Sequence, residues 1–384
     1  MRTVGIICEY NPFHLGHRKQ IQAIKSRFEG DCAVICLMSG NFVQRGHPAI
    51  FDKSLRARAA VLSGADLVLE LPVTCALSSA EGFARGGVEI LGKFCDYLCF
   101  GCETGSEALL MDTAGALLSP QFQPILREEL EKGVSFPAAR AAALEKMGLD
   151  ADILRRPNDI LAVEYCKAIL TTGTAMKPLP IVREGNYHAE APDPENPSAT
   201  ALRKLIGETG DWQTYVPEVT RPVFENASVH CLKAGERAVL MKLRTMTDEE
   251  FEPLPYGSEG LWRKFMHACR KEATLEAITA ATKSKRYTAT RIDRMLMCAF
   301  LGITAEMLAQ PAPYVRMLAL NDTGRSVLKQ IRQLMPCINA GEIPDSPYWL
   351  LEKRCADLYS LFAATIEAPG GEEKQRIYYH KETL

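Results

Sequence analysis

Two histidines flank a glycine at the point where an apolar, strand-like run gives way to a helical pattern. The stretch reads Glu9-Tyr10-Asn11-Pro12-Phe13-His14-Leu15-Gly16-His17. Pro12 fixes the loop, and Gly16 leaves the helix start bare, so a phosphate can approach the free N–H groups and the positive end of the helix dipole. Imidazoles beside it can donate hydrogen bonds to a phosphoryl transition state while charge moves onto a leaving pyrophosphate. The pattern therefore predicts a nucleotide site.

Single histidines more often serve the fold, in which case His14 would cap the helix and His17 would lie on the surface. Their pairing around Gly16 at a strand-to-helix turn favours nucleotide binding. Residues 3–17 contain no G-x-G-x-x-G, and no G-x-x-x-x-G-K-[ST] occurs anywhere in the sequence. Dinucleotide redox chemistry and P-loop hydrolysis are therefore disfavoured.

The bulk composition is that of an ordinary globular protein. The chain has 384 residues, a length that predicts two domains. Of these residues 47% are hydrophobic and 24% are charged, with a formal charge of −2, so any basic surface must be local. It begins without a basic, apolar leader, and charged residues interrupt every apolar run before the ~18 residues that a membrane span needs. We expect a soluble, cytoplasmic protein without membrane contact, and the sequence indicates no protein partner.

Cysteine usage points to a reducing compartment. The 13 cysteines, an odd number, lie mostly in apolar segments, where cysteine acts as a small hydrophobe. Cys99 and Cys102 have the spacing of half a zinc site, but the second pair is missing, so we assign no metal-binding residue.

The first half of the chain alternates strand-like and helical segments, as the βα units of a parallel sheet do. This predicts an α/β fold with a Rossmann-like, doubly wound parallel sheet. Ligands of such sheets bind beyond the carboxyl ends of the strands, so the loops that begin at Glu9, Ser39, Pro72 and Gly101 should share one cleft. We expect strands at 3–9, 32–39, 65–71, 96–101 and 179–183, and helices at 16–27, 52–62, 79–93 and 107–118.

From about Glu225 amphipathic helical stretches replace the strand-like runs. The expected helices are 235–244, 261–271, 291–301 and 348–362. We therefore predict a nucleotide-binding catalytic domain over 1–224, an all-helical domain over 225–368 and a flexible C-terminal tail over 369–384.

The histidine turn resembles that of the HxGH nucleotidyltransferase superfamily, which includes pantetheine-phosphate adenylyltransferases and class I aminoacyl-tRNA synthetases. Longer stretches throughout the chain resemble the bacterial tRNA(Met) cytidine acetate ligases. They are residues 7–17, 38–46, 48–53, 56–57, 64–72, 100–101 and 157–161, Arg183 with Tyr187 and His188, then 198–203, 258–261, 283–287 with Arg291 and Arg294, and 313–316.

The resemblance implies a two-step, ATP-dependent ligase. Acetate attacks the α-phosphate of ATP to give acetyl-adenylate and pyrophosphate, and the exocyclic amine of the wobble cytidine of elongator tRNA(Met) then takes the acetyl group, which gives N4-acetylcytidine. ATP is thus a co-substrate, and Mg²⁺ is inferred from the charge of the triphosphate. The ATP contacts that the resemblance implies are Ile7, Cys8, Glu9, Tyr10, Asn11, Pro12, Phe13, His14, Leu15, Gly16, His17, Arg18, Lys19, Gln20, Gly101, Asn158 and Arg183.

Three of these contacts have a chemical rationale of their own. Gly101 ends a strand where the backbone can lie against a ring or ribose, and the Asn158 amide can read adenine or a hydroxyl. Arg183 can clamp phosphate bidentately. Judged without the resemblance, Asn158 could equally cap the helix before Ile160, and Arg183 could equally form a surface salt bridge.

Further candidates for phosphate chemistry lie at two predicted helix starts. Ser198, Thr200 and Arg203 place hydroxyls and a guanidinium together, although an ordinary N-cap with a solvated arginine would look the same. Lys53 and Arg56, one helical turn apart, could neutralise triphosphate or belong to a solvated helix face. The predicted catalytic residues are His14, His17, Lys53 and Arg203.

A local excess of positive charge lies between residues 261 and 294. Such clustering in a near-neutral protein suits contact with a phosphate backbone, and Tyr287 beside Arg286 could stack on an unpaired base. A solvated face is the alternative for any such charge run. The predicted tRNA-binding residues are Lys283, Lys285, Arg286, Tyr287, Arg291 and Arg294.

The sequence departs from the family pattern at three positions. His47 stands where an acidic residue is expected, Leu15 where asparagine is common, and Pro197 where a small residue is usual. Two other functions compete with the ligase. A small-molecule adenylyltransferase of coenzyme biosynthesis would need no basic helical domain, and a non-catalytic RNA-binding protein would not need His14, His17 and Arg203.

Overall fold

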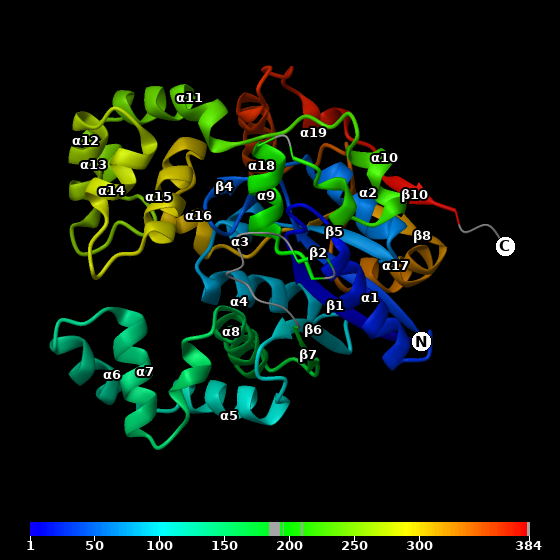
Figure 1. Cartoon of the computed structure of the whole chain (residues 1–384), viewed down its shortest axis with the longest axis horizontal. Helices are drawn as coiled ribbons and strands as arrows, with labels where there is room; N and C mark the ends of the chain where they lie inside the picture. The colour runs from blue at the N-terminus through cyan, green and yellow to red at the C-terminus, as the bar shows by residue number, and fades with distance from the viewer. Residues whose placement is uncertain (184–192, 195, 209, 382–384) are drawn as a thin grey trace.

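A computed structural model describes residues 1–183, 193–194, 196–208 and 210–381. Within these residues one sheet has the strand order β10-β8-β5-β2-β1-β6-β7, with β9 paired to β8 (Figure 1). The pairs β1–β2, β1–β6, β2–β5 and β6–β7 are parallel, and β5–β8 is antiparallel. The strands are β1 (Arg2–Cys8), β2 (Cys32–Ser39), β3 (Phe42–Val43), β4 (His47–Pro48), β5 (Leu67–Leu71), β6 (Tyr97–Cys102), β7 (Lys177–Val182), β8 (Val315–Asn321), β9 (Cys337–Asn339) and β10 (Tyr378–His380).

Helices cover both faces of this sheet because alternate residues of each central strand point to opposite sides. Val34 and Cys36 of β2 pack with α1 and α2, whereas Ile35 and Leu37 pack with α4, α5 and α8. The predicted doubly wound α/β sheet is therefore confirmed. The helices of the first half are α1 (Leu15–Arg27), α2 (Lys53–Leu62), α3 (Val73–Ala76), α4 (Ala80–Leu91), α5 (Glu107–Leu118), α6 (Phe122–Glu131), α7 (Phe136–Lys146), η1 (Ala151–Leu154) and α8 (Pro157–Thr172).

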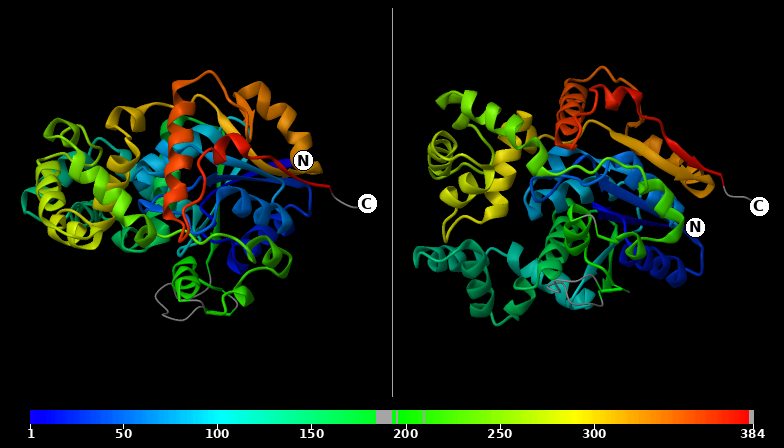
Figure 2. Two further views of the ribbon diagram at one scale, coloured as in Figure 1. Left: turned by 90° about the horizontal axis from the view of Figure 1, so that it is seen from above. Right: turned by 45° about the horizontal axis from the view of Figure 1, so that its top comes forward.

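The helices α11 to α16 form a unit beside the sheet in Figures 1 and 2, and its apolar core is shared with Phe42, Leu77 and residues of α18 and η4. Phe251, Phe265 and Met295 are buried in that core. The remaining helices are α9 (Ala199–Gly207), η2 (Gln213–Tyr215), η3 (Glu218–Thr220), α10 (Arg221–Phe224), α11 (Leu232–Thr245), α12 (Asp248–Phe251), α13 (Leu261–Lys271), α14 (Leu275–Thr282), α15 (Ala289–Leu301), α16 (Ala305–Ala309), α17 (Asp322–Leu334), α18 (Pro347–Tyr359), η4 (Ser360–Phe362) and α19 (Gly371–Lys374).

Two parts of the predicted domain division are wrong. The chain does not stay helical to residue 368, because β8 returns to the main sheet and all seven of its residues are buried there. Nor is 369–381 a loose tail, since α19 packs on α18 and β10 pairs with β8. The pairings of β8 with β5 and of β10 with β8 join segments far apart in the sequence, which local periodicity does not reveal. In the described residues we find no helix with the length and apolar character needed to cross a bilayer.

Candidate active site

The loop after β1 follows a fixed path to the start of α1. The Asn11–Pro12 peptide is cis, and Asn11 Oδ1 accepts a hydrogen bond from Ile50 N at 2.7 Å. Tyr10 and Phe13 are buried in the core between the sheet and α1. These anchors deliver His14 to the N-cap position of α1.

The imidazoles of His14 and His17 stack with their ring centroids 3.7 Å apart. His14 Nδ1 accepts from Gly16 N at 3.1 Å, and His17 Nδ1 accepts from His14 N at 3.3 Å. Because each Nδ1 acts as an acceptor, each neutral ring carries its proton on Nε2. The donor that each ring can present to a ligand is therefore Nε2–H.

Both histidines are neutral near pH 7. Burial, followed by the charges of Arg183 and Arg203, lowers the pKa of His14 to about 3. Desolvation, followed by the influence of His14 and Arg183, holds the pKa of His17 well below its usual range. Of these causes, the positive charges of Arg183 and Arg203 would also attract an anion.

Gly16 leaves the approach to α1 open beside the imidazoles. A Cβ at Gly16 would lie 3.0 Å from His14 Cε1 and 3.9 Å from the carbonyl oxygen of Pro197. Lys19 Nζ donates to Asn196 Oδ1 at 3.1 Å, so the segment ahead of α9 lies over the first turn of α1. The departure at Pro197 therefore falls on the wall of this site.

The structure brings Arg203 from α9 to the histidine turn. Ser198 caps α9 by accepting from Ala201 N. Arg203 donates to the carbonyl oxygen of Asn11 at 2.7 Å and to Thr200 Oγ1 at 3.1 Å. Burial lowers the pKa of Arg203, yet guanidinium stays charged at neutral pH. The predicted cluster of Ser198, Thr200 and Arg203 thus lies beside the turn.

Gly101, Asn158 and Arg183 come together from three elements. The side chain of Arg183 lies across Gly101, where a Cβ would be 2.5 Å from Arg183 Cδ. Arg183 donates to Asn158 Oδ1 at 3.3 Å, and Asn158 Nδ2 donates to Glu103 Oε1 at 2.6 Å. Asn158 lies inside α8 rather than at its N-cap, which is Arg156. Tyr187 and His188 lie outside the described residues.

Several side chains of the 7–20 segment serve the fold instead of facing the turn. Ile7, Tyr10 and Phe13 are buried, and Gln20 Nε2 donates to Cys99 Sγ at 3.6 Å. Burial raises the pKa of the Cys8 thiol well above its usual range. Nucleotide contact by the three buried residues would therefore have to come from their main-chain atoms.

The setting of Lys53 contradicts both readings of its sequence position. Its ammonium is buried and lies 2.7 Å from each carboxylate oxygen of Glu70 and from Oε2 of Glu372. Burial alone would lower the pKa of Lys53, but Glu372 and Glu70 outweigh it and raise the pKa. Lys53 therefore neutralises protein carboxylates and is neither a triphosphate ligand nor part of a solvated face.

Arg56 likewise supports the site from inside the protein. It is buried, and its guanidinium donates to the carbonyl oxygens of Phe51 at 2.8 Å and Ser39 at 3.1 Å, and to those of Glu9 and Gly40. Glu9 directly follows β1, Ser39 and Gly40 lie at the end of β2, and Phe51 lies just before α2. Arg56 thus joins the two loops that border the histidine turn.

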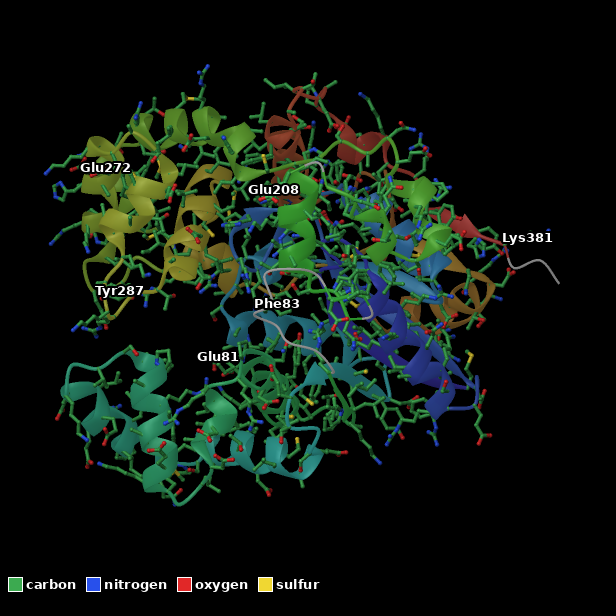
Figure 3. All side chains as sticks on the ribbon, viewed as in Figure 1. Glu81, Phe83, Glu208, Glu272, Tyr287 and Lys381 are labelled. Atoms are coloured by element: carbon green, nitrogen blue, oxygen red, sulfur yellow. The ribbon has the colours of Figure 1, made fainter. Side chains whose placement is uncertain are left out.

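The predicted RNA surface divides into exposed and engaged residues. Lys283, Lys285 and Arg286 are exposed in the connection between α14 and α15, and Tyr287 is half-buried against the core at the edge of the helical unit (Figure 3). Arg286 donates to Glu259 Oε1 at 2.9 Å and Tyr287 Oη donates to Glu259 Oε2 at 2.7 Å. The three cations are accessible, although the exposed carboxylate of Glu259 already binds Arg286 and Tyr287.

Arg291 and Arg294 bind parts of the protein instead. Arg291 donates to the carbonyl oxygen of Tyr256 at 2.8 Å and to Ser258 Oγ at 3.0 Å. Arg294 lies over the ring of Tyr256 with its guanidinium carbon 5.1 Å from the centroid, and it donates to the carbonyl oxygen of Gln44 at 3.4 Å. Sequence spacing could not reveal these partners, nor the pairing of Glu259 with Arg286 and Tyr287, which are 27 and 28 positions away.

Comparison with known proteins fits this geometry. Residues 1–374 match the family described as HIGH Nucleotidyl Transferase, and the paired histidines around Gly16 at a strand-to-helix turn are the feature expected of that class. The tRNA(Met) cytidine acetate ligase of Acetivibrio thermocellus is 36% identical over 360 residues, which cover 87% of this chain and 86% of that protein. That of Alkaliphilus metalliredigens is 34% identical over 423 residues and covers 100% of both.

A solved structure shows the same fold over the whole length. Thermotoga maritima TmcAL bound with alpha-thio ATP has 29% sequence identity and a TM-score of 0.88, with 100% of both chains covered. The chain belongs to the HIGH nucleotidyl transferase family and, within it, to the family of tRNA(Met) cytidine acetate ligases. The resemblance found in the sequence is thereby confirmed.

Proposed function

We propose that this chain is an ATP-dependent tRNA(Met) cytidine acetate ligase. The observation that carries the proposal is the convergence of His14 and His17 with Arg203 and Arg183 on one helix start, although the two arginines come from elements far along the chain. A convergent, positively charged, partly buried site suits a triphosphate. The curated relatives bear the name of this activity.

In the first step an acetate oxygen attacks the α-phosphorus of ATP and the bond from that phosphorus to pyrophosphate breaks. His14 and His17 can donate from Nε2 to phosphate oxygens as negative charge moves toward the leaving group. Arg203 and Arg183 supply fixed positive charge at the same place. Because the imidazoles are neutral before ATP binds, ion pairs do not orient them. Hydrogen bonds from the backbone N–H groups of His14 and Gly16 to their Nδ1 atoms orient them instead.

In the second step the exocyclic amine nitrogen of cytidine attacks the acyl carbon of acetyl-adenylate. The new C–N bond forms, the C–O bond to adenylate breaks, AMP leaves and the amine proton passes to solvent. Lys283, Lys285 and Arg286 are proposed to contact tRNA phosphates because they are exposed. Tyr287 is also proposed to contact the RNA. Arg291 and Arg294 are proposed to hold this surface in place through their hydrogen bonds within the protein.

Mg²⁺ is proposed to accompany the triphosphate. The described residues contain no group of three or more His, Cys, Asp or Glu side chains placed to hold a metal, so the phosphates themselves would supply most ligands. The ion would shield charge on the triphosphate. The protein's own contribution is to orient the α-phosphate with the histidine turn and Arg203.

ATP–pyrophosphate exchange tests the proposal with the purified chain. We expect exchange that requires acetate, and N4-acetylcytidine in tRNA(Met) by nucleoside mass spectrometry when ATP, acetate and the tRNA are present together. Exchange driven by a phosphopantetheine-like or nucleotide acceptor without acetate would instead identify a small-molecule adenylyltransferase. Absence of any exchange would leave only RNA binding and would contradict the proposal.

A further inference from the structure

One loop of the sheet domain contacts both the histidine turn and the helical unit. It runs from β3 (Phe42–Val43) to β4 (His47–Pro48), which pair in antiparallel fashion. On the side of the nucleotide site, Gln44 N donates to Glu9 Oε1 at 2.8 Å. Glu9 directly follows β1, so this hydrogen bond fixes the loop to the first residues of the turn.

On its other side the same loop packs on α15. Gly46 has a φ of +79°, and a Cβ there would lie 2.5 Å from the carbonyl carbon of Asp293 and 2.6 Å from Arg294 N. His47 Nε2 lies 3.8 Å from Asp293 Oδ2. The backbones of the loop and the helix are therefore in direct contact, and only glycine fits between them.

The helix that Gly46 touches begins two residues after Tyr287 and so carries the exposed basic connection at its start. A second contact holds the same unit, because Tyr256 Oη donates to the carbonyl oxygen of Leu77 at 2.7 Å and Arg294 lies over the ring of Tyr256. The helical unit thus packs on the loop between β3 and β4 and on the end of α3, and its core also packs on α18 and η4. These contacts together set the position of its basic surface relative to the histidine turn.

We propose that Gly46 is a positioning residue for acetyl transfer. Its missing side chain lets α15 sit directly against the loop that Glu9 holds, and this contact sets where tRNA bound to the helical unit presents its cytidine amine. The proposal rests on the proposed function, because it concerns the second step of that reaction. Gly46 itself touches neither nucleotide nor RNA.

Acetyl transfer is the step that should depend on these contacts. The amine nitrogen must reach the acyl carbon at about 3–3.5 Å from above the plane of the carbonyl group, and a displacement of about 1 Å can cost ~10²-fold in rate. Activation of acetate uses groups of the sheet domain and α9. Binding of tRNA uses the exposed cations, so a displaced helical unit can still bind tRNA. The cytidine amine would then lie too far from the acyl carbon.

The test is Gly46→Ala against the matched control Gly30→Ala. Gly30 has a φ of +81° with no heavy atom within 4 Å of an added Cβ, so the control carries the same backbone strain without the clash. In Gly46→Ala we expect acetate-dependent exchange and tRNA affinity close to the control, and single-turnover acetyl transfer from preformed acetyl-adenylate at least ~10-fold slower.

Three results would overturn the inference: equal transfer rates in the two variants, a parallel loss of exchange, or a loss of tRNA affinity that accounts for the slower transfer. If Gly46→Ala does not fold, Tyr256→Phe repeats the test against the wild type, because it removes the hydrogen bond from Tyr256 Oη to the carbonyl oxygen of Leu77, the second contact that holds the helical unit. Acetyl transfer at the wild-type rate in that variant would also overturn it. Wild-type protein that shows no acetate-dependent exchange would refute the proposed function instead.

Discussion

The histidine turn and the basic connection between α14 and α15 are built in opposite ways. At the turn, His14 is 1% exposed, its ring is fixed by a hydrogen bond to Gly16 N, and Arg203 is held by two acceptors. In the connection, Lys283 and Lys285 are exposed, and Arg286 meets the carboxylate of Glu259. Chemistry on phosphate needs fixed donors, whereas attraction of a polyanion needs only accessible charge.

The first prediction concerns the turn and should have the largest effect. We expect His17→Ala to lower acetate-dependent ATP–pyrophosphate exchange by at least ~10²-fold, because loss of one transition-state donor costs about 2.7–4 kcal/mol. The variant should retain the circular dichroism spectrum and tRNA affinity of the wild type. Exchange near the wild-type rate in a folded variant would remove His17 from the catalytic assignment.

The second prediction concerns the neutral state of His14. Its pKa in the fold, about 3, lies below the usual value of 6.5. As the pH falls, the His14 imidazole is therefore protonated in the unfolded chain before it is protonated in the folded protein. The free energy of unfolding decreases from about pH 6.5 downward. Between pH 7 and 5 we expect wild type to lose about 2 kcal/mol more unfolding free energy than His14→Asn, measured with urea.

Asparagine is the matched replacement in that experiment because its side-chain oxygen can still accept from Gly16 N at the N-cap. An equal loss of stability in both proteins would show that His14 titrates normally. The histidine turn would then be more accessible to water than the burial of His14 indicates.

The third prediction concerns the exposed connection. The double variant Lys285→Ala, Arg286→Ala should weaken tRNA binding, and the slope of log affinity against log salt should flatten by up to ~1.4–1.8 if both side chains contact phosphate. ATP–pyrophosphate exchange should be unchanged, because these residues belong to the other region. Normal affinity with an unchanged salt slope would mean that the connection is only a solvated surface.

The smallest effect is expected from Glu259, which pairs with Arg286 and Tyr287. Glu259→Gln removes the internal charge but keeps an oxygen acceptor, so both partners become more available to phosphate. We expect tRNA affinity to rise by up to ~5-fold in a filter-binding or fluorescence titration, since exposed ion pairs are weak. Weaker binding would instead indicate that Glu259 itself contacts the RNA or orders its loop.

The sequence predicted the regions that depend on local pattern. The α/β sheet, the bounds of β2 and α5, and the helix start at Ser198 agree with expectation. Strand alternation, helical spacing and a cap residue act within a few positions, so they are visible in the chain itself.

The failures all involve partners distant in the sequence. Lys53 could be read as a triphosphate ligand or as a solvated helix residue until Glu372, 319 positions away, is seen beside it. Arg294 looks like an RNA contact until Gln44 is found under it. The sheet also gains β8 and β10 from the far end of the chain. Such pairings are decided by tertiary packing, which periodicity and composition do not encode.

A pulse-chase experiment with labelled acetate tests the division between the two regions most directly. Incubation of the chain with ATP and labelled acetate should give enzyme-bound acetyl-adenylate without tRNA, and addition of tRNA(Met) with excess unlabelled acetate should move that label into N4-acetylcytidine. In Lys285→Ala, Arg286→Ala the first product should form normally and the chase should slow; in His17→Ala the first product should fail to form. Label that reaches tRNA without prior acetyl-adenylate, or from acetyl coenzyme A without ATP, would contradict the account.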